Sequence, residues 1–225
     1  MNPEQLQYYS LQLLYYNLLV QIVIAVSITL TVIVALFQEN IKKYLSRPQL
    51  TLSLRTEEGN LTKRSNNIKT IYFHLLIKNR KPNRVSINTK ICCLDLIIIG
   101  NDKSFHRQPI TTPLPLRWAF DESLGQLRNV IDSDICDIGY IDENDNKFII
   151  DFLFRPNNVR GYILGGETAL VKLNIRADNF HSTSIYCYKI YWNGKWTEVI
   201  KEMDENLNIT KIQDLAKYLR ELKDI

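Results

Sequence analysis

The chain has 225 residues, of which 45% are hydrophobic and 23% are charged, a composition typical of globular and not of disordered proteins. Its 28 lysines and arginines all follow residue 41, whereas two of its 24 acidic residues precede it. Residues 41–225 therefore carry +6 (28 minus 22) and the first forty residues carry −2. A length of this order suits one globular domain with an appendage, and it excludes any need for metals or disulfides to complete a core.

Residues 18–37 form an uncharged run of twenty residues. At about 1.5 Å per helical residue such a run crosses a hydrocarbon core of about 30 Å, so it predicts a transmembrane helix. A cleaved signal peptide has basic residues before its apolar stretch and small residues at the cleavage site. Here the chain begins Met-Asn-Pro-Glu-Gln and the run ends in Leu36, Phe37 and Gln38. We expect the segment to remain as an anchor.

The flanking charges predict the orientation of this anchor. No lysine or arginine precedes the run, whereas Lys42, Lys43 and Arg47 follow it. The positive-inside rule then predicts a single-pass protein of the cell (inner or plasma) membrane, with its N-terminus outside and residues 38–225 in the cytoplasm. A reducing compartment also agrees with cysteines that pack as small apolar side chains rather than as disulfides. The four cysteines are Cys92, Cys93, Cys136 and Cys187.

Three polar side chains in the N-terminal helix, Ser10, Asn17 and Gln21, fall within roughly 40° of one another on a helical wheel. Carboxamides that face lipid are costly, whereas carboxamides that face a second helix form hydrogen bonds with it. The pattern predicts self-association of the anchor. The alternative is that these side chains are hydrated at the membrane interface.

After Pro48 the pattern changes to alternating apolar and polar residues, which predicts strands. The acidic turn 142–146 predicts a hairpin between two of them. Asn193 and Gly194 form the strongest hairpin signal in the chain, and predict that a strand over 196–199 pairs with the strand before it. The other predicted strands cover residues 50–54, 72–78, 87–99, 135–141, 148–154, 170–175 and 185–192.

One helix is predicted over 210–224, because Thr210 and Gln213 form a capping box before an apolar stripe. Strands without intervening helices predict a mainly β, antiparallel sandwich or barrel, with this helix against a sheet face. The expected domains are an anchor with a juxtamembrane helix over 1–47 and a cytoplasmic β domain over 48–225.

Residues 73–80 and 87–94 resemble the B–C strand region of immunoglobulin-like domains in membrane-anchored bacterial proteins. In both, an alternating strand ends in Asn, here Asn79, and a loop leads to a second alternating strand. This chain has Arg80 where the family often has Gly, and it lacks the paired cysteines and tryptophan of antibody domains. The resemblance implies an immunoglobulin-like β-sandwich and no activity.

The sequence contains no visible catalytic or metal-binding constellation. His74, His106 and His181 are scattered, without the spacing of metal ligands. His74 alternates within a strand and is expected to be structural. The acidic turn 142–146 lacks the glycine and glutamate of a calcium loop, and no nucleophile elbow occurs. We therefore expect a protein that is not an enzyme and uses no metal or cofactor.

Eight basic residues and no acidic residue occur within 59–94. They predict a surface for anionic lipid headgroups or for a phosphate-bearing ligand, with a solvated face as the alternative. Nucleic acid is not an expected partner, because the aromatic residues of 186–196 are not interleaved with them. The basic residues are Lys63, Arg64, Lys69, Lys78, Arg80, Lys81, Arg84 and Lys90.

Two functions fit these features. The first is a membrane-anchored binding or scaffold protein that presents its cytoplasmic sandwich to a protein partner. The alternative is a membrane-acting effector or sensor, in which the β domain binds a small anionic ligand and the anchors oligomerise. In architecture alone this alternative resembles small bacterial immunity effectors of antiviral defence. The expected partners are the lipid bilayer, a protein partner or second copy and, in the alternative, the ligand.

Overall fold

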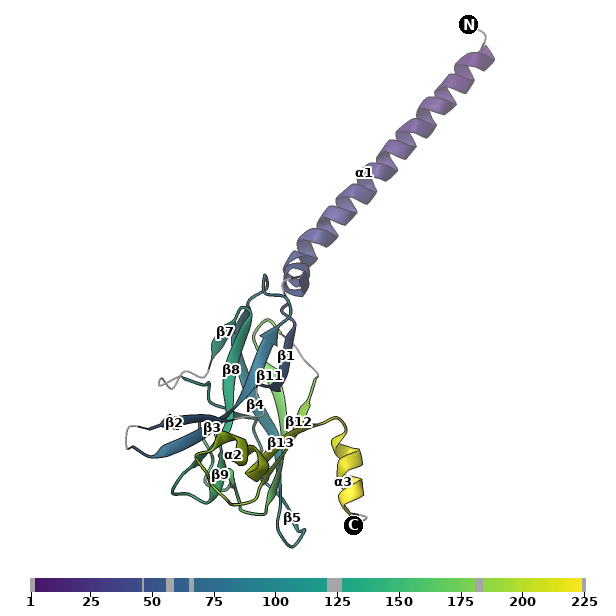
Figure 1. Ribbon diagram of the computed structural model, residues 1–225. Helices are drawn as coiled ribbons and strands as arrows, with labels where there is room; N and C mark the ends of the chain where they lie inside the picture. Colours follow the sequence, from purple (N-terminus) through teal and green to yellow (C-terminus); the bar gives the residue numbers. More distant parts are fainter. Residues whose placement is uncertain are drawn as a thin grey trace. The chain divides into compact units, whose positions relative to one another are not determined.

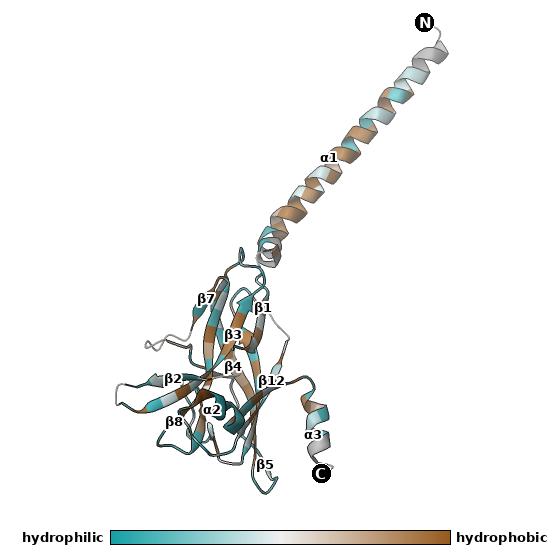
Figure 2. Cartoon of the chain, viewed as in Figure 1, coloured by the Kyte–Doolittle hydropathy of each residue, from teal (hydrophilic) through white to brown (hydrophobic). Residues whose placement is uncertain are grey.

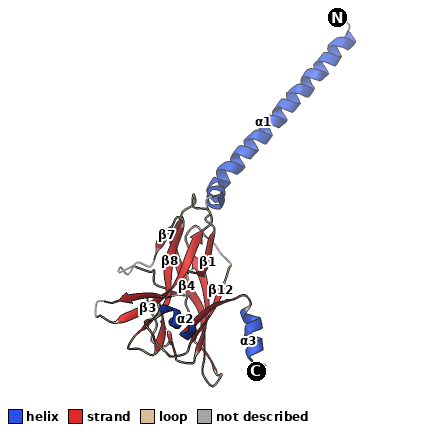
Figure 3. Ribbon diagram, viewed as in Figure 1, coloured by secondary structure: helices blue, strands red, loops and turns tan. Residues whose placement is uncertain are grey.

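The computed structural model describes residues 3–45, 47–55, 59–64, 67–120, 127–180 and 184–223. The chain divides into two compact units, Met1–Ser46 and Arg47–Ile225. The first contains one helix, and the second contains two short helices and all the named strands (Figures 1 and 3). About 45% of the chain is in strands, so the predicted mainly β class is confirmed.

Helix α1 is a continuous 43-residue helix, Pro3–Leu45. Within the described residues it is the one helix that is long and apolar enough to cross a membrane, over Tyr8–Gln38, and a signal sequence has the same properties. Apolar residues dominate the middle of the helix (Figure 2). The hydroxyls of Ser27, Thr29 and Thr31 each donate to the carbonyl four residues earlier, at 2.8 Å. Their hydrogen bonds are therefore made within the helix, as an apolar environment requires.

Sheet 1 has six antiparallel strands and curls into half of a barrel. Their order is β1-β3-β8-β9-β10, and β2 pairs with β3. The strands are β1 (Leu50–Leu54), β2 (Asn60–Lys63), β3 (Lys69–Asn79), β8 (Ser133–Asp142), β9 (Lys147–Ile150) and β10 (Tyr162–Leu164).

Sheet 2 has seven antiparallel strands in the order β13-β12-β11-β4-β5, and β6 and β7 also pair with β4. The strands are β4 (Ser86–Ile99), β5 (Phe105–Arg107), β6 (Leu114–Pro115), β7 (Arg128–Val130), β11 (Thr168–Arg176), β12 (Tyr186–Trp192) and β13 (Leu207–Ile212).

The two sheets share one hydrophobic core. In the strand that was predicted over 185–192, the alternate residues Tyr186, Tyr188, Ile190 and Trp192 are all buried in this core. The core also takes in every second residue of β3, from Ile71 to Ile77. Burial of alternate side chains from both sheets accounts for the period-two pattern of the sequence.

The C-terminal region differs from the prediction. The residues predicted as a strand over 196–199 are a loop, which is followed by helix α2 (Ile200–Asn206). The strand that follows β12 in the chain and pairs with it is therefore β13. The predicted helix over 210–224 begins later, as α3 (Leu215–Lys223), so Thr210 lies in β13 and does not cap a helix.

Two local features explain these differences. Residues 207–210 alternate apolar and polar side chains, and the whole segment Leu207–Ile212 pairs with β12. The actual helix signal is Asp214, whose Oδ1 accepts a hydrogen bond from the backbone N of Lys217 at 3.0 Å. The side chain of Asn193 donates to that of Asn206 at 2.6 Å, and this contact closes the longer connection in place of a two-residue turn.

Candidate functional site

A β-bulge in sheet 1 decides which side chains meet on its outer face. The register of β3 and β8 shifts between Phe73 and His74, so that Phe73 lies opposite Gly139 and His74 lies opposite Asp137. The extra residue, Ile138, is fully buried in the core. Because a one-residue shift reverses the alternation of a strand, Asp137 faces away from the core on the same side as His74.

His74 and Asp137 form a buried polar pair. His74 Nδ1 lies 2.5 Å from Asp137 Oδ1, and the side chains are only 3% and 6% exposed. An ionised carboxylate accepts but does not donate, so we assign the proton of this bond to Nδ1. The second ring nitrogen, Nε2, is buried and has no hydrogen-bond partner among the described residues. The pair therefore leaves one oriented ring nitrogen without its hydrogen bond.

A second carboxylate lies across the sheet from Asp137, beyond the segment 115–119. The backbone N of Asp137 donates to the carbonyl of Arg117 at 2.9 Å, and the backbone N of Arg117 donates to that of Asp151 at 3.0 Å. Arg117 Nε lies 3.5 Å from Asp151 Oδ1. Burial raises the pKa of Asp151 to about 6, Arg117 acts against this rise and Asp137 adds to it. His74, Asp137, Arg117 and Asp151 thus form a charged row across the sheet.

This row lies along a pocket of about 780 Å³, a volume typical of small-molecule sites. Its walls come from β2, β3, β8 and the segment 117–120. The pocket contains cationic and aromatic side chains together, which suits a ligand with both a charge and a ring. The cations are Lys63, Arg64 and Arg117, and the exposed or half-buried rings are Tyr72, Tyr140 and Phe120.

The tyrosines hold Arg64 in place. Its guanidinium carbon lies 4.2 Å from the centre of the Tyr140 ring, and its Nε donates to the Tyr72 hydroxyl at 3.0 Å. Its NH1 group lies 3.3 Å from Asp142 Oδ2. The Tyr72 ring also stacks parallel to the His74 ring, with centroids 6.5 Å apart. These contacts fix the orientation of the cation before any ligand arrives.

Phe120 lines the pocket in an unfavourable conformation. Its side chain is 77% exposed, its φ is +58°, and its ring lies 5.8 Å from that of His74. Exposure of a phenylalanine and a left-handed backbone are both costly. Local strain of this kind occurs at binding sites, where a bound molecule covers the side chain.

A smaller hollow of about 420 Å³ adjoins the pocket and shares Arg117, Tyr140 and Asp151 with it. The hollow adds the ring of Tyr162, over which Lys147 Nζ lies at 5.4 Å from the centroid. The two hollows together form a groove along sheet 1, lined by further cationic side chains.

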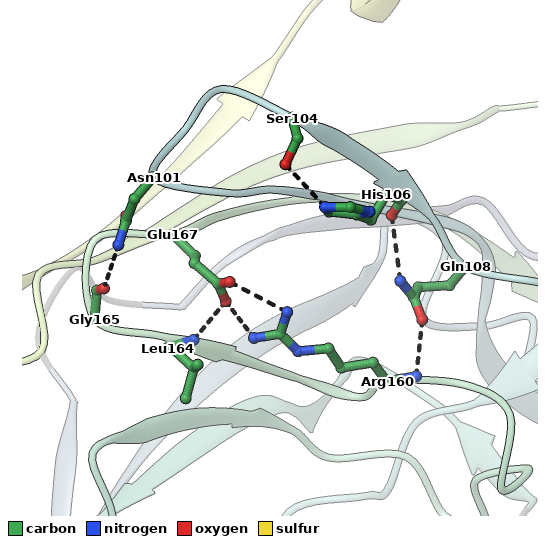
Figure 4. A network of polar contacts seen from close by, with 8 residues as sticks. All are labelled: Asn101, Ser104, His106, Gln108, Arg160, Leu164, Gly165 and Glu167. Carbon is green, nitrogen blue, oxygen red and sulfur yellow. Dashed lines mark hydrogen bonds and ion pairs between the residues drawn. The ribbon is translucent and has the colours of Figure 1, made fainter.

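A polar network holds Arg160, which contacts the Tyr162 ring of the smaller hollow (Figure 4). The Arg160 guanidinium makes two bonds to the carboxylate of Glu167, whose Oε2 also accepts from the backbone N of Leu164 at 2.7 Å. The backbone N of Arg160 donates to Gln108 Oε1 at 2.8 Å. Arg160 lies over the Tyr162 ring at 4.7 Å, so the network that joins sheet 2 to β10 also positions this ring.

The eight predicted basic residues do not form one surface. Lys63 and Arg64 line the pocket, and Lys69, at the same end of β3, is ion-paired with Glu198. Lys90 lies in β4 opposite Arg176. The remaining four lie at the other end of β3, about 30 Å away along an 11-residue strand. These four are Lys78, Arg80, Lys81 and Arg84.

The predicted self-association residues Ser10, Asn17 and Gln21 all lie within the unbroken helix α1 and inside the candidate span. The continuous helix keeps the three positions on one face. Anchor self-association itself stays a prediction.

The cysteines are free thiols, and Cys92, Cys93 and Cys136 are buried. Burial raises the pKa of Cys93 to about 12, and it also raises the pKa of the Cys136 thiol well above its ordinary value. Within the described part of the chain, no three His, Cys, Asp or Glu side chains are grouped as metal ligands.

Most of this site was not predicted from the sequence. His74 was expected to be structural, and no pattern singled out Asp137, Arg117 or Asp151. One signal was present, because the buried residues of β8 break strict alternation at Ile138 and so indicate the bulge. No local sequence pattern identifies Arg117 or Asp151, because long-range folding of the chain brings these residues to the site.

No family model matches the chain, and no curated protein sequence matches it. Its function is therefore inferred from the geometry of the site.

Proposed function

We propose that this chain is a membrane-anchored binding protein, whose cytoplasmic β domain takes a small anionic ligand in the pocket beside His74 and Asp137. The observation that carries the proposal is the buried, unpartnered Nε2 of His74 in a pocket of small-molecule size. With the assigned proton on Nδ1, Nε2 is an acceptor, so a ligand that donates a hydrogen bond to it removes the cost of a buried polar atom without a partner. The anionic group of the same ligand would lie against Lys63, Arg64 and Arg117.

The anchor and its orientation rest on the properties of α1. Its uncharged segment is long enough to span a bilayer, and lysines and arginine follow this segment but do not precede it. The free thiols of the β domain fit a reducing compartment. A single-pass protein of the cell membrane, with residues 47–225 in the cytoplasm, accounts for these features together.

For the β domain we propose an immunoglobulin-like sandwich. Support comes from the order β12-β11-β4 in sheet 2, which matches strands G, F and C, and from β1 beside β3, which matches A and B. One departure concerns β8, which occupies the position of strand E beside β3 but precedes its outer neighbour β9 in the chain. The immunoglobulin order has the outer strand D first.

The lining of the pocket favours an anionic ligand with a planar ring. Lys63 lies on the exposed strand β2, and Arg64 and Arg117 add two further cations. The rings of Tyr72 and Phe120 offer surfaces on which a planar group can stack. A protein partner is the other target considered for this domain. A concave pocket that contains a buried unpartnered atom fits a small molecule better than it fits the flat surface of a protein partner.

Ligand binding is tested with the full chain in detergent, by thermal unfolding in the presence of matched pairs of compounds. Adenosine monophosphate is compared with adenosine, and indole-3-carboxylate with indole. We expect at least one anionic compound to raise the unfolding temperature and its neutral counterpart to raise it less. Equal shifts within both pairs, or no shift with any compound, would contradict the anionic-ligand proposal.

A variant isolates the role of Nε2. His74→Asn keeps a donor near the position of Nδ1, which bonds to Asp137, and removes the atom at the position of Nε2. We expect this variant to lower the affinity for the anionic compound about tenfold or more. The matched control is His106→Asn, which changes an exposed histidine of β5 outside the pocket and should not change the affinity.

A further inference from the structure

A single buried side chain, Asn79, ties together three loops at one end of the β domain. Its Oδ1 accepts hydrogen bonds from the backbone N of Gln49 at 3.2 Å and of Lys81 at 3.1 Å. Its Nδ2 donates to the carbonyls of Arg84 at 2.8 Å and Ile131 at 3.0 Å. Asn79 is 1% exposed, and its carboxamide uses two donors and two acceptor sites. This end of the domain is therefore an organised surface.

The Asn79-bound end, which comprises residues 47–49, 78–87 and 130–132, presents four basic side chains at the end of β3 and in the loop that follows it. Among the described residues, no carboxylate forms an ion pair with any of the four. The pocket end differs, because Arg64 and Lys69 are paired there with Asp142 and Glu198. One exposed acid, Asp132, lies among the four cations. The four are Lys78, Arg80, Lys81 and Arg84.

The same end exposes branched apolar side chains. Ile131, whose carbonyl is bound by Asn79, is 59% exposed, and Val85 and Ile87 are exposed in the neighbouring loop and strand. The loop of Val85 is fixed by Asn179, which donates to the Val85 carbonyl at 2.8 Å and accepts from the backbone N of Ile87 at 2.9 Å. Apolar tips beside unpaired cations match the layered chemistry of a bilayer surface, with acyl chains beneath phosphates.

Few residues separate the candidate span from this end of the β domain. The candidate span ends at Gln38, α1 ends at Leu45, and Gln49 is already bound to Asn79. The eleven residues from Gln38 to Gln49, helical up to Leu45, cover at most roughly 25 Å. Any bilayer that contains the anchor is therefore within reach of these loops.

We propose that the Asn79-bound end docks on anionic lipid headgroups, with its cations over the phosphates and Ile131 and Val85 at the acyl boundary. The partner is the lipid surface itself. The proposal rests on the anchor of the proposed function but not on the ligand pocket. Each cation near an anionic membrane strengthens association about fivefold, so the loss of three weakens docking by roughly a hundredfold.

The test uses the full chain in lipid nanodiscs that contain nitroxide-labelled headgroups. A fluorophore is placed on Ile131→Cys or, as the opposite-end control, on Ser104→Cys, with the unsubstituted chain correcting for labelling of native cysteines. Ser104 follows the far end of the 14-residue strand β4. We expect strong quenching at position 131 in discs with phosphatidylglycerol, weak quenching there in pure phosphatidylcholine, and weak quenching at position 104 in both.

Two triple variants complete the test. Arg80→Gln, Lys81→Gln and Arg84→Gln together should reduce quenching at position 131 to its level in phosphatidylcholine. Lys103→Gln, Lys195→Gln and Lys201→Gln remove the same charge from exposed positions elsewhere and should leave it unchanged. Equal quenching in both lipids, equal effects of the two variants, or strong quenching at position 104 would overturn the proposal. A chain that does not insert into nanodiscs would instead contradict the anchor.

Discussion

His74 Nδ1 lies 2.5 Å from Asp137 Oδ1, although strict alternation along β8 would place the Asp137 side chain in the core. The bulge at Ile138 turns the carboxylate outward, and the pair it forms is then covered by the walls of the pocket. Both partners lost their hydration on burial and now depend on each other. Removal of one partner should therefore cost more stability than replacement of both partners by apolar side chains.

The first prediction concerns the stability of this pair. Asp137→Ala leaves His74 buried without its carboxylate and should lower the free energy of unfolding by about 3 kcal/mol or more. Replacement of both residues, as His74→Phe with Asp137→Leu, should cost clearly less, because no buried polar group is left without a partner. Urea unfolding followed by tryptophan fluorescence measures this, since all three tryptophans lie in the β domain. A double variant at least as unstable as the single one would contradict the interpretation.

Gly139 should tolerate no side chain. A Cβ at this position would lie 2.4 Å from the carbonyl oxygen of Ile149 and 2.4 Å from Phe148 Cζ. Neither group moves freely, because Phe148 is fully buried and Ile149 belongs to the paired strand β9. Gly139→Ala should therefore lower the free energy of unfolding by about 1–3 kcal/mol.

The matched control for this substitution is Gly100→Ala. A Cβ there would meet Oδ1 of Asp102 at 2.7 Å, but Asp102 is exposed, so its side chain can shift at the cost of solvent-exposed hydrogen bonds to Ser104. We expect a much smaller change in the urea midpoint. Similar losses at both glycines would show that the close approach of β8 and β9 is not the cause.

The strands that pack the core were predictable from the sequence, whereas the pairing between strands that are distant in the chain was not. Alternation marked the buried face of β12, because burial itself imposes the period of two. The pairing of β12 with β13 was missed, since Asn193 and Gly194 are a strong local turn signal and the contact between Asn193 and Asn206 is not local. Thr210 was predicted to cap the C-terminal helix, but it pairs with β12 in the sheet, and Asp214 caps the helix instead.

The candidate site was less predictable than the core, for a related reason. Its basic residues were grouped by their closeness in sequence, but the length of β3 separates Arg64 from Arg80. Arg117 and Asp151 meet because the segment 115–119 inserts between β8 and the end of β9. A pattern confined to one strand carries no information about such an insertion.

Asp151 should make stability depend on pH. Its pKa is raised from 3.8 to about 6, chiefly by burial. Between these values the folded state keeps a proton that the unfolded state has lost, so the free energy of unfolding falls as pH rises from about 4 to about 6 and then levels off. The size of the fall is about 3 kcal/mol. Urea unfolding at several pH values measures it.

Asp151→Asn is the control that isolates this group, because the other titrating side chains remain. The difference in stability between the two proteins should change by about 3 kcal/mol from pH 4 to pH 7, in favour of the variant at the higher pH. A constant difference would mean that Asp151 has an ordinary pKa in the folded protein.

The last prediction concerns the polar face of α1. Asn17 and Gln21 lie one turn apart inside the candidate span, where a second helix is a better hydrogen-bonding partner than lipid. If the anchors associate through this face, Asn17→Leu with Gln21→Leu should reduce the oligomer measured in detergent by light scattering. The control is Gln12→Leu, which changes a carboxamide on another face, bonded to the hydroxyl of Tyr8 at 3.2 Å. An oligomer unchanged by the double variant would remove the support for a sensor that acts through its anchor.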